Sequence, residues 1–265
     1  MNCKTLPLSG LRRGFTLIEL LTVISIIGVL AGLLIPAVSK AKVKAQVARA
    51  KTEIKGIEAS IASYEAHYHR YPSSPAARRA ASPDFTYGTA HDAEGDGSFI
   101  ILNDKKGRPL ASIGNNDLRL YQNSNSEVVG ILRNLTKFRD GRENTANRNS
   151  SQNPDKTDFL NAKDVEGFLP GGIGQDGVYR DPWGAPYIIS IDLNADGKCQ
   201  DGFYRKQAVS MISGNKGRNG LSRLNGVDTF ESSSPIMVWS LGPDGKADDK
   251  ISGDLGVNKD NIVSW

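Results

Sequence analysis

The feature that most constrains this chain is an almost unbroken apolar run from Gly14 to Val38, GFTLIELLTVISIIGVLAGLLIPAV. At about 1.5 Å per residue, a helix over this run can cross a bilayer core of about 30 Å. Between Phe15 and Ile35 the run holds one charged residue, Glu19. Because a carboxylate in hydrocarbon costs on the order of 2.5–3.5 kcal/mol, this acid predicts a functional partner. The alternative is a plain anchor whose acid, near one end, snorkels toward the head groups.

A short polar leader, MNCKTLPLSGLRRG, precedes the run. A secretory signal peptide is cleaved after its apolar region, whereas here the junction of polar and apolar residues lies before it, at Gly14-Phe15. The segment Arg12-Arg13-Gly14-Phe15, with Glu19 four residues further on, resembles the class III leader of type IV prepilins and of the pseudopilins of type II secretion systems. The resemblance implies that a prepilin peptidase cuts after Gly14 and methylates Phe15, and that the apolar helix stays in the mature protein.

Within the run, Glu19 and a glycine pair predict how subunits assemble. Cleavage would give Phe15 a free amine, and we expect Glu19 of one subunit to pair with the Phe15 amine of a neighbour, because a paired charge is tolerated where a lone one is not. Gly28 and Gly32 have the GxxxG spacing that lets membrane helices approach closely. Pro36 removes one helix hydrogen bond and predicts a kink. In the family that the leader resembles, this segment can lose helicity on packing; ordinary membrane glycine content is the alternative.

Charge and cysteine content limit the remaining classes of function. The leader carries three of the 33 Lys and Arg residues, so the mature chain has 30 basic against 29 acidic residues and gives no ground for a nucleic-acid partner. Cys3 belongs to the leader, and Cys199 alone cannot form an internal disulfide.

The expected location is the bacterial inner membrane, with a single span and the C-terminal domain in the periplasm. A count of cations on each side of the run favours the opposite orientation. The leader and the ease with which long domains translocate outweigh that count.

After Pro36, apolar residues recur at spacings of three and four, which predicts an amphipathic helix that stops at Tyr71-Pro72. We therefore expect an α+β, pilin-like fold, in which a long N-terminal helix packs on a small antiparallel sheet with long loops. The apolar stripe consists of Val43, Val47, Ala50, Ile54, Ile57, Ile61, Tyr64 and Tyr68. The expected divisions are the cleaved leader 1–14, the transmembrane and assembly helix 15–38, the amphipathic helix 39–71, a variable insertion 72–165 and a C-terminal β region 166–265.

The insertion carries the weakest signal. Serine, alanine and proline over 73–83, and asparagine with charge over 140–158, predict exposed loops. A strand over Ser98–Leu102 and a short helix over Glu127–Phe138 are expected between them. Major pseudopilins are short here, so the resemblance ends in this region, which we expect to decorate the surface.

The resemblance returns at 176–187, DGVYRDPWGAPY, which is similar to the DPWG-x-PY signature of major pseudopilins. Its turn is expected to direct Trp183 and Tyr187 toward the helix stripe. The turn consists of Asp181, Pro182, Trp183 and Gly184. Strands are expected over Tyr187–Ile191, Phe203–Tyr204 and Ile236–Leu241.

Two acidic, glycine-containing loops are candidate calcium sites. The loop over 240–249, which runs on to 259–265, resembles the calcium loop of major pseudopilins, and calcium takes six to eight oxygen ligands. The resemblance implies as ligands the Leu241 carbonyl, Asp244, Asp248 and Asp260, with Asp249, Asp254 and Asn261 as substitutes, because residues 250–258 lengthen the family loop. The alternative is a solvated acidic turn.

The second loop, DLNADG over 192–197, matches the opening of an EF-hand but has Phe203 where that pattern needs a glutamate. A second calcium ion there would use Asp192, Asn194, Asp196 and Asp201. A β-hairpin turn of the same sequence needs no metal.

Taken together, these features imply a structural pseudopilin that polymerises into the periplasmic pseudopilus of a type II secretion system. The implied partners are further copies of itself, minor pseudopilins, the prepilin peptidase and the inner-membrane secretion platform. No catalytic constellation is found, and no organic cofactor is expected. The alternatives are a type IV pilin for adhesion, motility or DNA uptake, and a membrane-anchored, calcium-dependent binding module. The DPWG turn and the missing disulfide favour the secretion branch.

Overall fold

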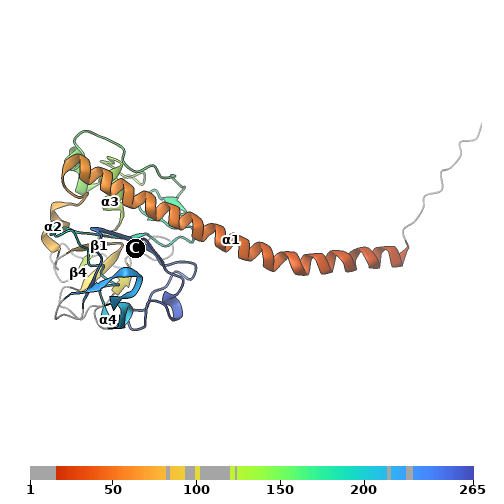
Figure 1. Cartoon of the computed structure of the whole chain (residues 1–265). Coiled ribbons are helices and arrows are strands. Elements are labelled where there is room, and N and C mark those ends of the chain that lie inside the picture. The colour runs from red at the N-terminus through yellow and green to blue at the C-terminus, as the bar shows by residue number, and fades with distance from the viewer. Residues whose placement is uncertain are drawn as a thin grey trace, which may run out of the picture. The chain divides into compact units, whose positions relative to one another are not determined.

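The computed structural model describes residues 16–81, 84–92, 99–101, 120–122, 124–213, 216–224 and 229–265. The chain divides into two compact units, Met1–Lys44 and Ala45–Trp265. One helix, α1 (Leu17–Tyr68), runs through both units (Figure 1). The expected α+β class is confirmed by this helix and by the antiparallel sheets of the second unit.

In the first unit, α1 exposes its apolar side chains. Between Leu17 and Val38 the large apolar residues are 47% to 81% exposed. The helix is continuous through Pro36. Among the described residues, α1 is the one helix long and apolar enough to span a membrane. Within the described residues of this unit, no other segment covers these side chains. An exposed apolar surface of this size is typical of a region that contacts a membrane or another protein.

In the second unit, the predicted stripe of α1 is buried. Val47 and Tyr68 are partly buried at its two ends, whereas Val43, in the first unit, is 42% exposed. The helix ends at Tyr68, before the predicted stop, because His69 adopts a left-handed conformation (φ 52°) and donates its N–H to the Glu65 carbonyl at 2.7 Å. The fully buried residues of α1 are Ala50, Ile54, Ile57, Ser60, Ile61 and Tyr64.

The stripe packs on a four-stranded antiparallel sheet of order β1-β7-β12-β13. Its strands are β1 (Phe85–Tyr87), β7 (Ile188–Ile191), β12 (Ile236–Ser240) and β13 (Ile262–Val263). Pairing of Val238 with Ile189 and of Trp239 with Ile188 fixes the register. Ile189 and Val238 join the cluster on α1, whereas Ile188 and Trp239 join a second cluster with Phe203 on the other face. Both faces are buried, which explains why these strands are apolar runs without alternation. The strands expected near Tyr187 and Ile236 are confirmed.

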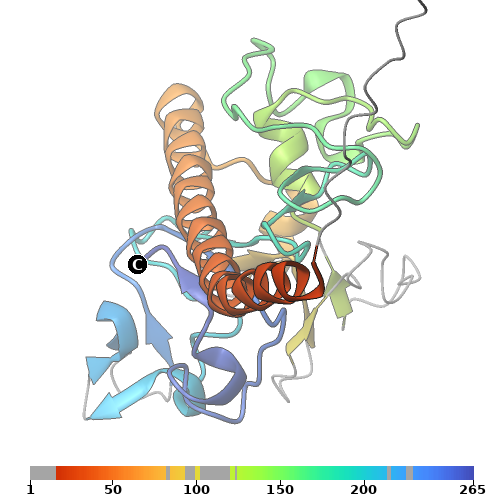
Figure 2. The same cartoon turned by 90° about the vertical axis from the view of Figure 1, so that its right-hand side faces the viewer.

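The second cluster is formed by residues of the C-terminal half. Figure 2 shows the short strands and helices of this half. A second sheet has the order β11-β10-β9-β8, a third β3-β2-β4, and β5 pairs with β6. The remaining elements are α2 (Pro75–Ala80), β2 (Thr89–Asp92), β3 (Phe99–Ile101), β4 (Leu120–Gln122), α3 (Ser126–Leu132), η1 (Thr145–Ser150), β5 (Gly172–Ile173), β6 (Tyr179–Arg180), α4 (Gln207–Ser210), β8 (Met211–Ser213), β9 (Lys216–Gly217), η2 (Arg218–Gly220), β10 (Ser222–Arg223), β11 (Phe230–Glu231) and η3 (Gly256–Asn258).

The strand predicted at Phe203–Tyr204 is wrong. These residues form a turn, because the Asp201 carboxylate accepts the N–H of Phe203 at 2.9 Å and of Tyr204 at 2.8 Å. Their rings are nevertheless buried, so the apolar signal reports burial rather than strand pairing.

The insertion is part of the core, which corrects the expectation that it decorates the surface. Val128, Ile131 and Leu132 of α3 are fully buried in the cluster that covers α1. The helix ends at Leu132 rather than at Phe138. The strand expected over Ser98–Leu102 corresponds to β3, and its two end residues lie outside the described residues.

Asparagine side chains explain why the stretch 140–158 is more buried than its composition predicts. Asn153 donates to the Ile131 carbonyl at 3.0 Å and accepts the Tyr68 hydroxyl at 2.8 Å. The Tyr64 hydroxyl donates to the Gln152 carbonyl. These bonds supply partners that regular secondary structure would otherwise provide, so a polar loop is packed against the end of α1.

Among the ion pairs of the described residues, the one between Asp176 and Arg180 is buried and gives a stability prediction. Arg180 forms a bidentate pair with Asp176, at 2.6 and 3.0 Å, and their side chains are 0% and 6% exposed. Asp176→Asn should lower the free energy of unfolding by about 3–5 kcal/mol, because it leaves a buried guanidinium charge unpaired. The control is Asp155→Asn at the exposed pair with His67, where the loss should stay below about 1 kcal/mol. Equal losses in denaturant titrations of the two variants would contradict this ranking.

Candidate functional site

The first candidate site is the N-terminal end of α1. Thr16 and Glu19 form a reciprocal capping box: the Glu19 carboxylate accepts the Thr16 N–H at 2.8 Å and its hydroxyl at 2.7 Å, and the Thr16 hydroxyl accepts the Glu19 N–H at 3.3 Å. The T-x-x-E spacing in the sequence is the signal for this cap, and the membrane-based argument missed it. Glu19 therefore has a local structural role besides any role in assembly.

The other predicted assembly residues lie along the exposed part of α1. A Cβ atom added at Gly28 or at Gly32 would meet nothing within 4 Å in the described part of the chain. Both positions are thus free for the close approach of another helix. The processing residues Arg12, Arg13, Gly14 and Phe15 lie outside the described residues.

The second candidate site begins at the turn after β6. Asp181 is fully buried, and its Oδ1 accepts the N–H groups of Trp183, Gly184 and Ala185 at 2.8–3.0 Å. Its Oδ2 accepts the Ser240 hydroxyl at 2.6 Å, which ties the turn to the end of β12. Burial raises the Asp181 pKa to about 6, against the opposing effect of these hydrogen bonds.

The turn directs its aromatic residues as predicted. The Tyr187 ring is buried in the cluster on α1 and its hydroxyl donates to Glu53 at 2.6 Å, whereas Trp183 packs on the cluster from a partly buried position. Pro182 accepts a bond from Gln46 of α1 through its carbonyl, at 3.2 Å.

The C-terminal acidic loop follows directly on β12 and brings two of its predicted ligands together. The Asp260 carboxylate accepts the Asp244 N–H at 3.1 Å. A Cβ atom at Gly242 would lie 2.1 Å from the Asp260 carbonyl oxygen, so the peptide after Leu241 lies against Asp260. Burial, followed by the Asp244 charge, raises the Asp260 pKa. Asn261 has a buried Oδ1 atom without a hydrogen-bond partner and donates to the Tyr204 hydroxyl.

Asp248, Asp249 and Asp254 take part in other interactions within the protein. The Asn258 side chain accepts the Asp248 N–H at 2.8 Å and donates to the Asp248 carbonyl at 2.7 Å. Asp249 forms an ion pair with Lys206 at 2.5 Å, and Asp254 forms one with Arg218 of η2 at 2.6 Å. Over the described ranges, no three His, Cys, Asp or Glu side chains form a group that could hold a metal. The ligand set predicted from the resemblance stays a prediction.

The loop over 192–197 is closed by its own hydrogen bonds. The two Asp192 oxygens accept the N–H groups of Ala195 at 2.6 Å and Gly197 at 2.8 Å, and Asn194 binds Asp196 at 3.0 Å. Asp201 is engaged in the core.

Besides the two amides of the turn, the Asp201 carboxylate accepts the Ser190 hydroxyl at 2.7 Å and the Trp239 indole N–H at 3.0 Å. Four donors occupy the lone pairs of this carboxylate, so Asp201 has a structural role in the fold.

One charged residue near this loop escaped the sequence analysis. Asp84 precedes β1, and its Oδ2 accepts the Gln200 N–H at 2.7 Å, while its Oδ1 is buried without a partner. Burial, together with the charges of Asp192 and Asp196, raises the Asp84 pKa to about 6. The environment of Asp84 depends on residues more than 100 positions further along the chain, so no local sequence pattern could have identified it.

A comparison with known protein families supports the processing motif predicted at the N-terminus. Residues 11–35 match the family model of the prokaryotic N-terminal methylation motif. This match confirms the resemblance inferred from Arg12-Arg13-Gly14-Phe15 and Glu19.

Curated relatives fall into two groups. The chain is 43% identical over 67 residues to type II secretion system core protein G of Pectobacterium carotovorum subsp. carotovorum, covering 25% of this chain and 43% of the relative. It is 41% identical over 63 residues to the core protein G of Escherichia coli (strain K12), covering 24% and 43%. It is 34% identical over 76 residues to type IV major pilin protein PilE1 of Neisseria gonorrhoeae, covering 29% and 46%. The chain thus spans less than half the length of these relatives. No solved structure matches it.

The raised pKa of Asp84 predicts how stability depends on pH. The folded chain keeps this proton up to about pH 6, whereas the unfolded chain loses it near the ordinary value of 3.8, so the folded state binds more protons between these values. The contribution of Asp84 to stability is therefore present at low pH and lost as pH rises through about 6.

Asp84→Asn removes this titration and retains an acceptor for Gln200. The melting temperature of the variant minus that of the wild type should be more positive at about pH 7.5 than at about pH 4. The same difference at both pH values would contradict the assignment.

Proposed function

We propose that this protein is a pseudopilin, a structural subunit that polymerises into the periplasmic pseudopilus of a type II protein secretion system. The observation that carries the proposal is the exposed apolar half of α1 with its methylation motif, joined to a compact α+β unit. The relatives named as type II secretion system core protein G and as type IV major pilin support a filament subunit.

Processing follows from the leader. A prepilin peptidase cuts between Gly14 and Phe15 and methylates the new N-terminus. The apolar half of α1 then holds the subunit in the inner membrane, with the second unit in the periplasm, until it joins the filament. The assembly partners are copies of the same chain, minor pseudopilins and the inner-membrane secretion platform.

Assembly uses the charge of Glu19. The carboxylate caps its own helix through Thr16 in the single chain, and in the filament it pairs with the Phe15 amine of a neighbour. The two roles are separable by chemistry, because capping needs only an acceptor whereas amine pairing needs a charge.

Calcium stiffens the C-terminal loop in this proposal. The Asp260 carboxylate accepts the Asp244 N–H, and Asp260 lies against the Leu241-Gly242 peptide. The next residue, Asn261, has a buried Oδ1 atom without a hydrogen-bond partner. Oxygen donors of this kind suit Ca²⁺, which would neutralise the two carboxylates. With two side-chain carboxylates, carbonyl groups and water would complete the coordination.

The second candidate function is a type IV pilus subunit. The similarity to gonococcal PilE1 favours it, since both groups of relatives match to a similar extent. The turn at Asp181 and the single mature cysteine, Cys199, favour the secretion branch. Neighbouring genes distinguish the two: a secretion ATPase and an outer-membrane secretin indicate export, and a retraction ATPase indicates a pilus.

The assembly role is tested with a matched pair of variants. Glu19→Gln keeps an acceptor for the Thr16 cap and removes the charge, whereas Thr16→Ala weakens the cap and keeps the charge. In cells with the native machinery, Glu19→Gln should reduce filaments at least about tenfold, as loss of about 1.4 kcal/mol would, and Thr16→Ala should retain them. Filament yield is measured in the sheared fraction by immunoblotting. Wild-type yield from Glu19→Gln would overturn the charge-pairing role.

The calcium role is tested on the full chain in detergent. Calcium should raise the melting temperature of the wild type by several degrees and chelator should reverse this, because a ligand that binds only the folded state stabilises it. Asp260→Asn should lose most of the response, while Asp254→Asn, whose carboxylate pairs with an arginine of η2, should keep it. A wild-type melting temperature that ignores calcium would remove the site from the account.

A further inference from the structure

Ser240, the last residue of β12, links the buried turn after β6 to the C-terminal acidic loop. Its side chain is fully buried, and its hydroxyl donates to the Asp181 carboxylate at 2.6 Å. The same oxygen atom accepts the N–H of Gly242 at 3.0 Å. One hydroxyl group therefore joins a charged group of the turn to the backbone at the start of the loop.

The bond to Gly242 fixes the direction of the Leu241 carbonyl. Both groups belong to the peptide unit between these two residues, which is planar, so its N–H and C=O groups turn together. Gly242 has a left-handed backbone (φ 70°), and a Cβ atom there would overlap the Asp260 carbonyl oxygen. The orientation of this peptide is thus set by Ser240 on one side and by the close approach of Asp260 on the other.

The turn that Ser240 contacts is itself fixed. Oδ1 of Asp181 accepts three N–H groups of the turn at 2.8–3.0 Å, which leaves Oδ2 for the Ser240 hydroxyl. The carbonyl of the next residue, Pro182, accepts the Gln46 side chain of α1 at 3.2 Å. A carboxylate with this many donors has one favourable position, so the turn offers Ser240 a fixed acceptor.

We infer that Ser240 is a positioning residue for calcium in the C-terminal loop. It supplies no ligand itself. It holds the Leu241 carbonyl, one of the oxygen atoms of the proposed loop site, in the orientation that the Asp181 turn sets. This inference rests on the proposed calcium role and adds to it a dependence on a turn 59 residues earlier in the chain. Groups that orient a metal ligand in this way are part of how a site obtains its affinity.

Ser190 of β7 offers a matched control. Its side chain is also fully buried, and its hydroxyl donates to a buried carboxylate, that of Asp201, at 2.7 Å. Removal of either serine hydroxyl costs the fold a hydrogen bond to a buried aspartate. Of the two hydroxyl groups, the one that accepts an N–H of the acidic loop is that of Ser240.

Calcium affinity, measured by isothermal titration calorimetry on the full chain in detergent, tests the inference. Ser240→Ala should raise the calcium Kd by about 10- to 100-fold, the usual cost of removing a group that orients a metal ligand, and Ser190→Ala should leave it unchanged. An unchanged Kd in Ser240→Ala would overturn the inference and leave the calcium role standing. Absence of calcium binding by the wild type would overturn both.

Hydrogen exchange in the calcium-free chain separates positioning from a general loss of stability. The Asp244 N–H bonds Asp260 and not Ser240, so its exchange reports what is transmitted along the loop. Mass spectrometry of peptides from the acidic loop should show exchange at least about tenfold faster in Ser240→Ala than in the wild type, because local opening raises the exchange rate.

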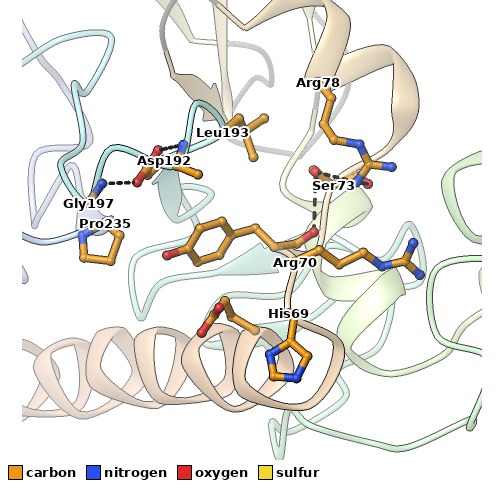
Figure 3. A pocket seen from close by; sticks show the side chains of 11 residues that line it. His69, Arg70, Ser73, Arg78, Asp192, Leu193, Gly197 and Pro235 are labelled. Carbon is orange, nitrogen blue, oxygen red and sulfur yellow. Dashed lines mark hydrogen bonds between the residues drawn. The ribbon is translucent and has the colours of Figure 1, made fainter.

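The loop 192–197 is the internal reference for this measurement. Its Asp192 carboxylate accepts the Gly197 N–H at 2.8 Å, beside a cavity of about 410 Å³, as Figure 3 shows. Exchange in this loop should be the same in Ser240→Ala and in the wild type. Equal acceleration in both loops would indicate general destabilisation and would overturn the inference.

The wild-type chain gives a test that needs no variant. Coupling between two sites is reciprocal, so calcium that fixes the Leu241-Gly242 peptide would also hold Ser240 against Asp181. Calcium should therefore slow hydrogen exchange at the three turn amides that bind Asp181. Calcium binding that leaves the exchange of these amides unchanged would show that the turn and the loop are not coupled, and the inference would be wrong.

Discussion

The two halves of α1 have opposite requirements for burial, and the rest of the molecule depends on this difference. From Val47 onward the apolar stripe packs against β7 and β12, and Ile54, Ile57 and Ile61 are excluded from water. From Leu17 to Val38 the large apolar side chains are exposed in the part of the chain that the structure describes. Exposure of so much apolar surface is unfavourable in water, at roughly 25 cal/mol per Å². The same helix is therefore both the core of a folded unit and a surface that needs lipid or other subunits.

Buried carboxylates organise the folded unit in place of disulfides. Asp181 holds the turn after β6 and joins it to β12, and Asp201 joins β7 and β12 on their second face. Asp176 neutralises the buried guanidinium of Arg180, which lies over the Phe168 ring. Each acid costs desolvation energy, which its hydrogen bonds offset only when every bond is present. The fixed loops that result suit a subunit whose surfaces must be reproduced in every copy.

Periodic and local signals in the sequence correctly predicted the buried face of α1, two strands of the main sheet and the methylation motif. The stripe of α1 follows from the recurrence of Val47, Ile54 and Tyr64 on one face, and the strands at Ile188 and Ile236 follow from apolar runs. The methylation motif is a contiguous pattern, so the leader alone was enough to recognise it.

What could not be predicted depends on contacts between distant segments. Asn153 carries a polar loop into the core, and Asn258 bonds the backbone of Asp248, and neither contact has a periodic signature. Phe203 is a residue type that is common in strands, but a hydrogen bond from its N–H to the Asp201 carboxylate stabilises a turn there. The cap between Thr16 and Glu19 was readable from its spacing and was missed, because the acid was judged only against the membrane.

The central claim is that the apolar half of α1 begins a processed subunit rather than an ordinary anchor. The most direct measurement is the intact mass of the chain extracted from the membranes of cells with an active prepilin peptidase. The account predicts a mass equal to residues 15–265 plus one methyl group, with the methyl group on the amine of Phe15. A chain that still carries residues 1–14 in those cells would contradict it.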